Sequence, residues 1–111
     1  MSRGDRQRLD DILAATEAIR GHLQRGTLDD GLVFDAVRVR LIEIGEAVKS
    51  LPPDLLAREA GPPWSQISSM RDRLAHRYFD TSHAIVNATV TDDLPELEAA
   101  VRRLCEVDEN D

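Results

Sequence analysis

The sequence GLVFDAVRVRLIEIGEAVKS, residues 31–50, has the spacing of an amphipathic helix. Its apolar residues recur every three or four positions, which places them on one side of an α-helix; they are Leu32, Val33, Val37, Leu41, Ile44 and Val48. We expect this helix to begin between Thr27 and Asp30, where acidic side chains favour a helix N-terminus, and to end near Ser50, before two prolines. Gly45 would allow another helix to approach closely.

The segments on either side predict further helices. Residues 5–24 carry apolar side chains at the same spacing and end before Gly26, and residues 52–63 are expected to be a connector with one helical turn. A third helix is predicted from Pro63 through Phe79, with one apolar face; this face holds Ile67, Met70, Leu74 and Tyr78.

A fourth helix is expected to follow, capped by Asp80-Thr81-Ser82. It either ends near Asp92 or continues, with a kink at Pro95, toward Val107. Four or five helices without a sheet predict an all-α fold, an antiparallel bundle. We expect one domain with its core over about residues 5–107 and a polar, acidic tip at 108–111. A core this small would gain stability from homodimerisation.

Composition narrows the class of protein. No apolar run reaches the roughly 18 residues that cross a bilayer, and the first residues lack the apolar core of a signal peptide. We therefore expect a cytoplasmic protein without a membrane partner. The single cysteine, Cys105, cannot form an internal disulfide, and no Cys or His cluster has zinc-site spacing. We expect no metal and no cofactor.

The net charge of −7 is unevenly distributed. Residues 92–111 hold eight acids against two arginines, a net charge of −6, which leaves −1 for residues 1–91. The sign reverses locally at residues 71–77, where Arg71, Arg73 and Arg77 stand beside one acid, Asp72, and the titratable His76. A polyanion could bind there.

This basic segment belongs to the sequence MRDRLAHRYFD, residues 70–80. On one ideal helix Arg71 and His76 project about 140° apart, so one chain would hardly aim both at a single phosphate. Two copies whose third helices, which carry the motif, lie near a twofold axis would place two histidines and two arginines around one groove. That set suits RNA cleavage without a metal: one imidazole removes the 2′-OH proton, the other protonates the leaving oxygen, and guanidiniums stabilise the phosphorane.

The same spacing also fits a structural interpretation, a solvated helix end with Arg71 paired to an acid. Arg73 and Arg77 fit either phosphate steering or plain solubility. Elsewhere, His22 and His83 are expected to be surface or capping residues, and Trp64 and Cys105 to pack.

Arg71, His76 and Tyr78 match the R-x4-H-x-Y motif of HEPN domains, in the form seen in HepT-like toxins of the HEPN/MNT toxin–antitoxin systems. The chain resembles that family over about residues 5–107, in segments that come in the same order: Ile44-Gly45-Glu46-Ala47, Pro63-Trp64 with Ile67 and Met70-Arg71, Tyr78-Phe79, Ile85-Val86 with Thr89-Val90, and Asp93-Leu94-Pro95.

The resemblance implies an all-helical homodimer that acts as a metal-independent endoribonuclease on RNA, the toxin of a type VII-like system. Arg71 and His76 of both protomers would line the cleft. The implied partner is a small MNT-type nucleotidyltransferase antitoxin that transfers AMP to Tyr78; the alternative is that Tyr78 only packs. Many members have Asn where this chain has Asp72, whose carboxylate would either repel phosphate or orient Arg71 or His76. The alternative function is a noncatalytic HEPN module that binds a nucleotide or scaffolds a nucleotidyltransferase.

Overall fold

The computed structural model describes the backbone at residues 1–75 and 79–110 and the side chains at residues 1–75 and 82–106. Within these ranges every regular element is helical, so the predicted all-α class is confirmed. The elements are α1 (Arg3–Arg25), α2 (Gly31–Lys49), α3 (Pro53–Leu56), α4 (Trp64–Ser68), α5 (Met70–Ala75), α6 (Phe79–Ala88), a π-helical turn η1 (Thr89–Asp93) and α7 (Leu94–Asn110).

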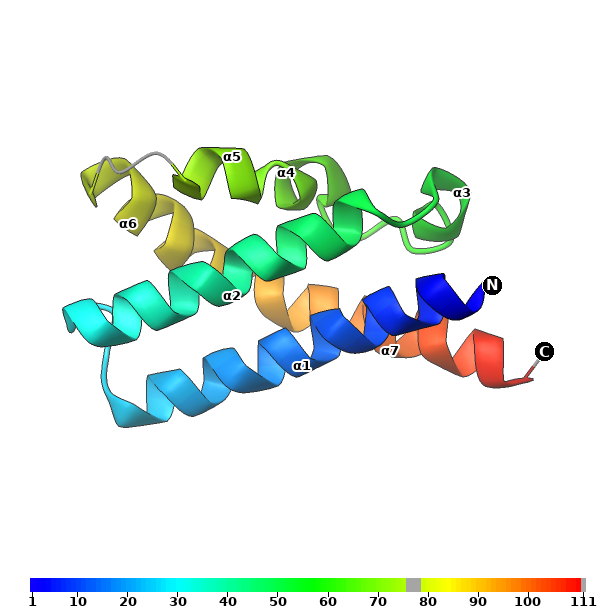
Figure 1. Ribbon diagram of the computed structural model, residues 1–111, viewed down its shortest axis with the longest axis horizontal. Coiled ribbons are helices and arrows are strands. Elements are labelled where there is room, and N and C mark those ends of the chain that lie inside the picture. The colour runs from blue at the N-terminus through cyan, green and yellow to red at the C-terminus, as the bar shows by residue number, and fades with distance from the viewer. Residues whose placement is uncertain (76–78, 111) are drawn as a thin grey trace.

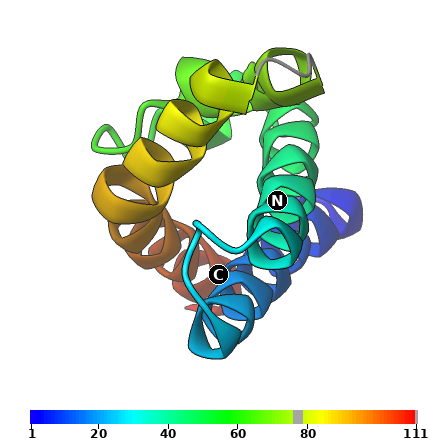
Figure 2. The ribbon, with the colours of Figure 1, turned by 90° about the vertical axis from the view of Figure 1, so that its left-hand side faces the viewer.

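The long helices form a bundle around one apolar interior. Helices α1 and α2 run antiparallel side by side, α7 packs against α1, and α4 and α5 lie along α2 (Figure 1). Figure 2 views the bundle along its length and shows α6 crossing from the α5 side toward α7. The resulting order places α5, which carries Arg71, directly on α2.

The starts of α1 and α2 follow from side-chain caps. The Ser2 hydroxyl accepts a hydrogen bond from the Asp5 N–H at 3.0 Å, and the Asp5 carboxylate accepts one from the Ser2 N–H at 3.4 Å. Asp30 caps α2, because its carboxylate accepts the Leu32 N–H at 2.9 Å. These caps satisfy N–H groups that lack intrahelical partners. The predicted limits of α2 are confirmed.

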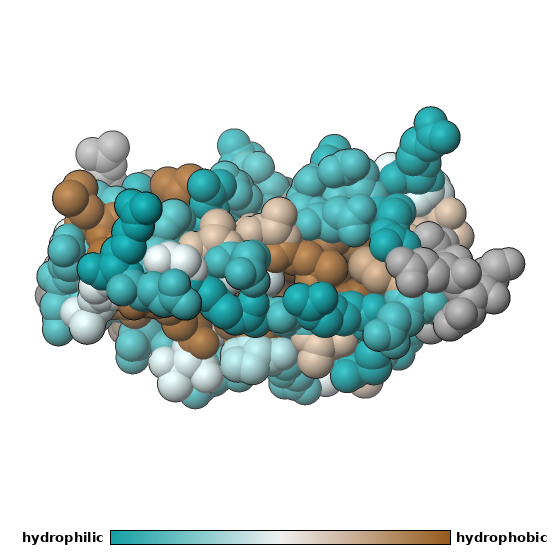
Figure 3. Space-filling view, turned by 90° about the horizontal axis from the view of Figure 1, so that it is seen from below, coloured by the Kyte–Doolittle hydropathy of each residue, from teal (hydrophilic) through white to brown (hydrophobic). Residues whose placement is uncertain are grey.

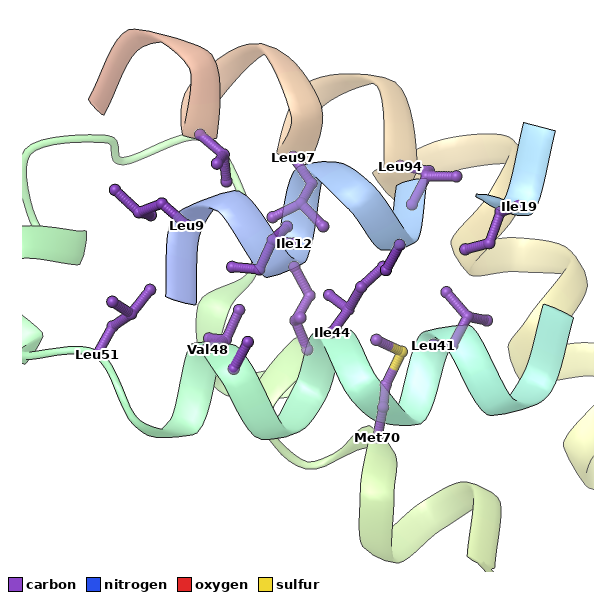
Figure 4. Packing of buried hydrophobic residues seen from close by; sticks show 14 of the residues in the cluster. Leu9, Ile12, Ile19, Leu41, Ile44, Val48, Leu51, Met70, Leu94 and Leu97 are labelled. Carbon is purple, nitrogen blue, oxygen red and sulfur yellow. The ribbon is translucent and has the colours of Figure 1, made fainter. Parts of the chain in front are cut away.

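The core consists of the apolar stripes that the spacing predicts. Side chains of α1, α2, α5 and α7 point into the same interior in Figure 4, where the labelled residues are Leu9, Ile12, Ile19, Leu41, Ile44, Val48, Leu51, Met70, Leu94 and Leu97. The assignment of Leu32 to the α2 stripe is wrong, because its side chain is 82% exposed. It lies seven residues from Val39, which is 47% exposed, so both share the outer face of α2.

The surface away from this core is mainly polar. Seen from below (Figure 3), hydrophilic side chains cover most of the molecule, and apolar ones show in a furrow between them. None of the described helices combines the length and hydropathy that crossing a lipid bilayer requires.

The predicted third helix is divided in two. It breaks at Ser69, whose hydroxyl donates to the Gln66 carbonyl at 2.8 Å, and the second part, α5, is described as far as Ala75. The proposed cap Asp80-Thr81-Ser82 is also wrong, since these residues lie within α6. Small polar and acidic residues suit both a cap and a first helical turn, which is why composition could not separate the two positions.

Of the two alternatives for the fourth helix, the structure has the continuous one. The Leu94 N–H donates to the Thr89 carbonyl, five residues back, within the π-helical turn. Pro95 follows at once, and it lacks an N–H and crowds the carbonyl four residues before it. The chain therefore approaches the proline through a widened, π-helical turn.

Gly45 sets the distance between α2 and α5, as its place in the sequence predicts. A Cβ atom there would lie 2.8 Å from the Ile67 carbonyl oxygen and 3.4 Å from the Arg71 backbone nitrogen. Because both neighbours are backbone atoms, a side chain would push α4 and α5 away from α2.

We expect Gly45→Ala to lower the free energy of unfolding by about 1 to 3 kcal/mol through overpacking, despite the better helix propensity of alanine. The matched control is Gly21→Ala in α1, where a Cβ would meet nothing within 4 Å. That change should raise stability by about 0.5 to 1 kcal/mol. Urea unfolding of both variants measures the difference, and equal effects would contradict a tight contact at Gly45.

Candidate active site

Arg71 lies on α5 and is paired with an acid of α2. Its Nε is 3.0 Å from Oε1 of Glu46, and the two side chains are 61% and 53% exposed. The pairing follows from the close contact at Gly45, because that contact brings the Arg71 backbone beside the residue that precedes Glu46. Glu46 was not singled out as a site residue in the sequence, although pairing of Arg71 with some acid was one interpretation.

Arg71 also lines a surface pocket between α2 and the α4–α5 segment. The lining residues are Glu46, Lys49, Ser50, Ser68, Arg71 and Asp72. Two cations and two carboxylates thus share this depression. Exposed ion pairs contribute little to stability, since water solvates both partners. The Arg71 guanidinium is therefore held in place by Glu46 but is available to a competing anion.

Arg73 lies apart from Arg71. The two residues project about 160° apart on a helix, and Arg73 lines a different, smaller pocket, beside Gln66, Ile67, Met70, Ile85, Ala88, Thr89 and Asp93. Burial raises the pKa of the Asp93 carboxyl, and the negative charges of Asp92 and Glu96 add to the effect. The structure brings Arg71 and Asp72 together and places Arg73 on another side of α5.

Three residues of the motif segment lie outside the described residues: His76, Arg77 and Tyr78. The described chain stops at Ala75, one residue before His76, and resumes at Phe79. Of the R-x4-H motif, the structure therefore describes Arg71 and the four residues that follow it.

The remaining candidates have structural roles. The Trp64 indole is half-buried and its Nε1 donates to the Glu59 carbonyl at 2.7 Å, so the predicted packing role is confirmed. Cys105 is buried, as expected of a structural thiol. His83 stacks on Phe34 with ring centroids 5.4 Å apart. Among the described residues, no group of three or more His, Cys, Asp or Glu side chains is arranged to hold a metal ion.

A family model described as ribonuclease HepT-like matches residues 9–104. The chain belongs to the ribonuclease HepT-like family. The match includes α5 and the whole R-x4-H-x-Y segment, so the family resemblance inferred from that segment is confirmed.

Relatives of this HepT-like protein carry ribonuclease names. A protein of Thermococcus cleftensis named "Probable ribonuclease HepT" is 32% identical over 108 residues, covering 94% of this chain and 98% of the relative. A "Putative RNase" of Caldanaerobacter subterraneus subsp. tengcongensis is 42% identical over 67 residues, 60% of each chain. A Methanocaldococcus jannaschii protein named "Gamma-glutamylcyclotransferase and putative RNase" is 32% identical over 102 residues, 88% of this chain and 46% of its own. No solved structure gives a significant match.

Proposed function

We propose that this HepT-like protein is a metal-independent endoribonuclease, the toxin of a type VII-like HEPN/MNT toxin–antitoxin system. The observation that carries the proposal is the state of Arg71: the motif arginine lies at the surface over a pocket and, within the described part of the chain, is paired with the exposed carboxylate of Glu46. An RNA phosphate would displace Glu46 and accept hydrogen bonds from the planar guanidinium.

The proposed reaction uses the RNA itself as nucleophile. One His76 imidazole takes the proton of the ribose 2′-OH, and the 2′-oxygen attacks the adjacent phosphorus. The bond from phosphorus to the 5′-oxygen breaks, and the protonated imidazole of His76 of the partner subunit supplies the proton to that oxygen. Arg71 stabilises the negative charge that develops on the phosphorane. The products are a 2′,3′-cyclic phosphate and a 5′-hydroxyl.

The second histidine requires a homodimer, and the outer face of α2 offers a surface for it. Leu32 and Val39 are exposed there on one face, and Ile42, only partly buried, borders the same face. Glu46, one helical heptad beyond Val39, continues this face to Arg71. A second copy docked against α2 would cover the apolar side chains and bring two Arg71 guanidiniums to one groove.

Purified protein incubated with total RNA in the presence of EDTA tests the proposal. We expect RNA fragments with cyclic phosphate ends, and no cleavage of DNA of matched sequence, which lacks the 2′-hydroxyl. The second candidate function is the noncatalytic HEPN module, which the two carboxylates in the Arg71 pocket favour. Intact RNA after this incubation would support that module and contradict the ribonuclease.

We expect Tyr78 to be the acceptor of AMP from the partner nucleotidyltransferase. A phosphodiester attached there would compete with RNA phosphate for Arg71 and inhibit without unfolding. Co-expression with an MNT-type nucleotidyltransferase, followed by intact-mass and peptide mass spectrometry, should show an added AMP on Tyr78. Tyr78→Phe is the control and should remain unmodified. Neutralised toxicity with unmodified Tyr78 would mean that the antitoxin inhibits by binding alone.

A further inference from the structure

The end of α5 opposite Arg71 is bound by a second side chain of α2. Nη1 of Arg38 donates to the Leu74 carbonyl oxygen at 2.7 Å, although the two residues are 36 positions apart in sequence. Arg38 is half-buried. Leu74 is fully buried and belongs to the last described turn of α5.

Helix α2 therefore fixes α5 at both ends. At one end Gly45 admits the backbone of Ile67 and Arg71, and Glu46 pairs with the Arg71 side chain. At the other end, two turns back along α2, Arg38 binds the Leu74 carbonyl. Leu74 is two residues before His76 in the sequence. One α2 contact thus lies at the arginine of the R-x4-H motif and the other at Leu74, two residues before its histidine in the sequence.

We propose that Arg38 is a positioning residue of the ribonuclease, which holds the α5 backbone at Leu74, two residues before His76 in the sequence. This inference rests on the proposed function. Arg38 acts through the α5 backbone and not on RNA. A small misplacement of a catalytic group is enough to slow a reaction about a hundredfold, so the effect of losing this contact should fall on kcat.

The test compares Arg38→Met, which keeps the length of the side chain without its donors, with Arg38→Lys, which keeps a cationic donor. We expect Arg38→Met to lower kcat by about tenfold to a hundredfold with KM changed less than about twofold, and Arg38→Lys to restore most of the rate. Arg40→Met is the matched control, because Arg40 pairs with Glu43 on its own helix. An unchanged kcat, or a rise in KM alone, would overturn the proposal; the latter would mean that Arg38 binds RNA.

Hydrogen exchange without RNA separates this proposal from the ribonuclease itself. The backbone amides of residues 71–75 should exchange faster in Arg38→Met than in the parent protein, with those of α1 unchanged. If the parent protein does not cleave RNA, the proposed function fails, and this measurement still decides whether Arg38 holds α5. Equal exchange in the two proteins would overturn the contact. If Arg38→Met does not fold, Arg38→Gln, which keeps a neutral donor, takes its place in both measurements.

Discussion

His76→Ala should abolish RNA cleavage while the protein stays folded and dimeric. Loss of a positioned general acid or base commonly slows a reaction by about 10² to 10⁴, and one substitution would remove both groups, since in the proposed dimer each protomer supplies one. Arg71→Ala should cause nearly the same loss, because the phosphorane charge would have no guanidinium beside it. Its partner Glu46 is exposed, so the fold should tolerate the change. Cleavage of a labelled RNA, with circular dichroism as the test of folding, measures both variants.

The control for His76→Ala is His83→Ala. His83 stacks on Phe34 rather than belonging to the R-x4-H motif, so its removal should leave the cleavage rate unchanged below the melting temperature of the variant. A His76→Ala protein that cleaves RNA at the parent rate would contradict the catalytic assignment and favour the binding module.

Val39→Asp should convert the dimer to a monomer and remove its ribonuclease activity. The change would place a carboxylate in the proposed contact between the α2 helices of two copies. A cost of about 4 kcal/mol for burying that charge corresponds to a dissociation constant about a thousandfold higher. Because Val39 is 47% exposed in the single chain, the protomer itself should remain folded. Light scattering together with the RNA assay gives both results.

The matched control is Ala14→Asp, which introduces the same charge at an exposed position of α1. It should leave the dimer and its activity intact. A monomeric Val39→Asp protein with undiminished cleavage would contradict the shared site, and a dimeric one would exclude the outer face of α2 as the interface.

The helices that sequence spacing predicted best are those with clear caps and one buried stripe. Ser2 and Asp30 mark the starts of α1 and α2, and the interior positions of α2 are buried from Val33 to Val48. Leu32 was misplaced because hydrophobicity alone does not say which neighbour covers a side chain. The break at Ser69 and the widened turn before Pro95 depend on packing between helices, which local preferences do not contain.

The residues of the candidate site also differ in whether the local sequence reveals them or only the packing of the helices does. The motif residues Arg71, His76 and Tyr78 are visible in the sequence because they stand close together. Glu46 and Arg38 belong to another helix, and only the packing of α5 on α2 brings them to Arg71 and Leu74. Neither has a local pattern that distinguishes it from the other charged residues of α2.

A π-helical turn contains one residue more than the α-helical turn that it replaces. The apolar spacing within α6 and within α7 is therefore that of an ordinary α-helix. Across Thr89–Asp93, however, the pattern of α7 is shifted by one residue relative to that of α6. A related chain that lacks one residue here would close the turn into ordinary α-helix and still direct the counterparts of Val86 and Leu97 to the core. Alignments of HepT-like chains should accordingly open a single-residue gap at this turn rather than within either neighbouring helix.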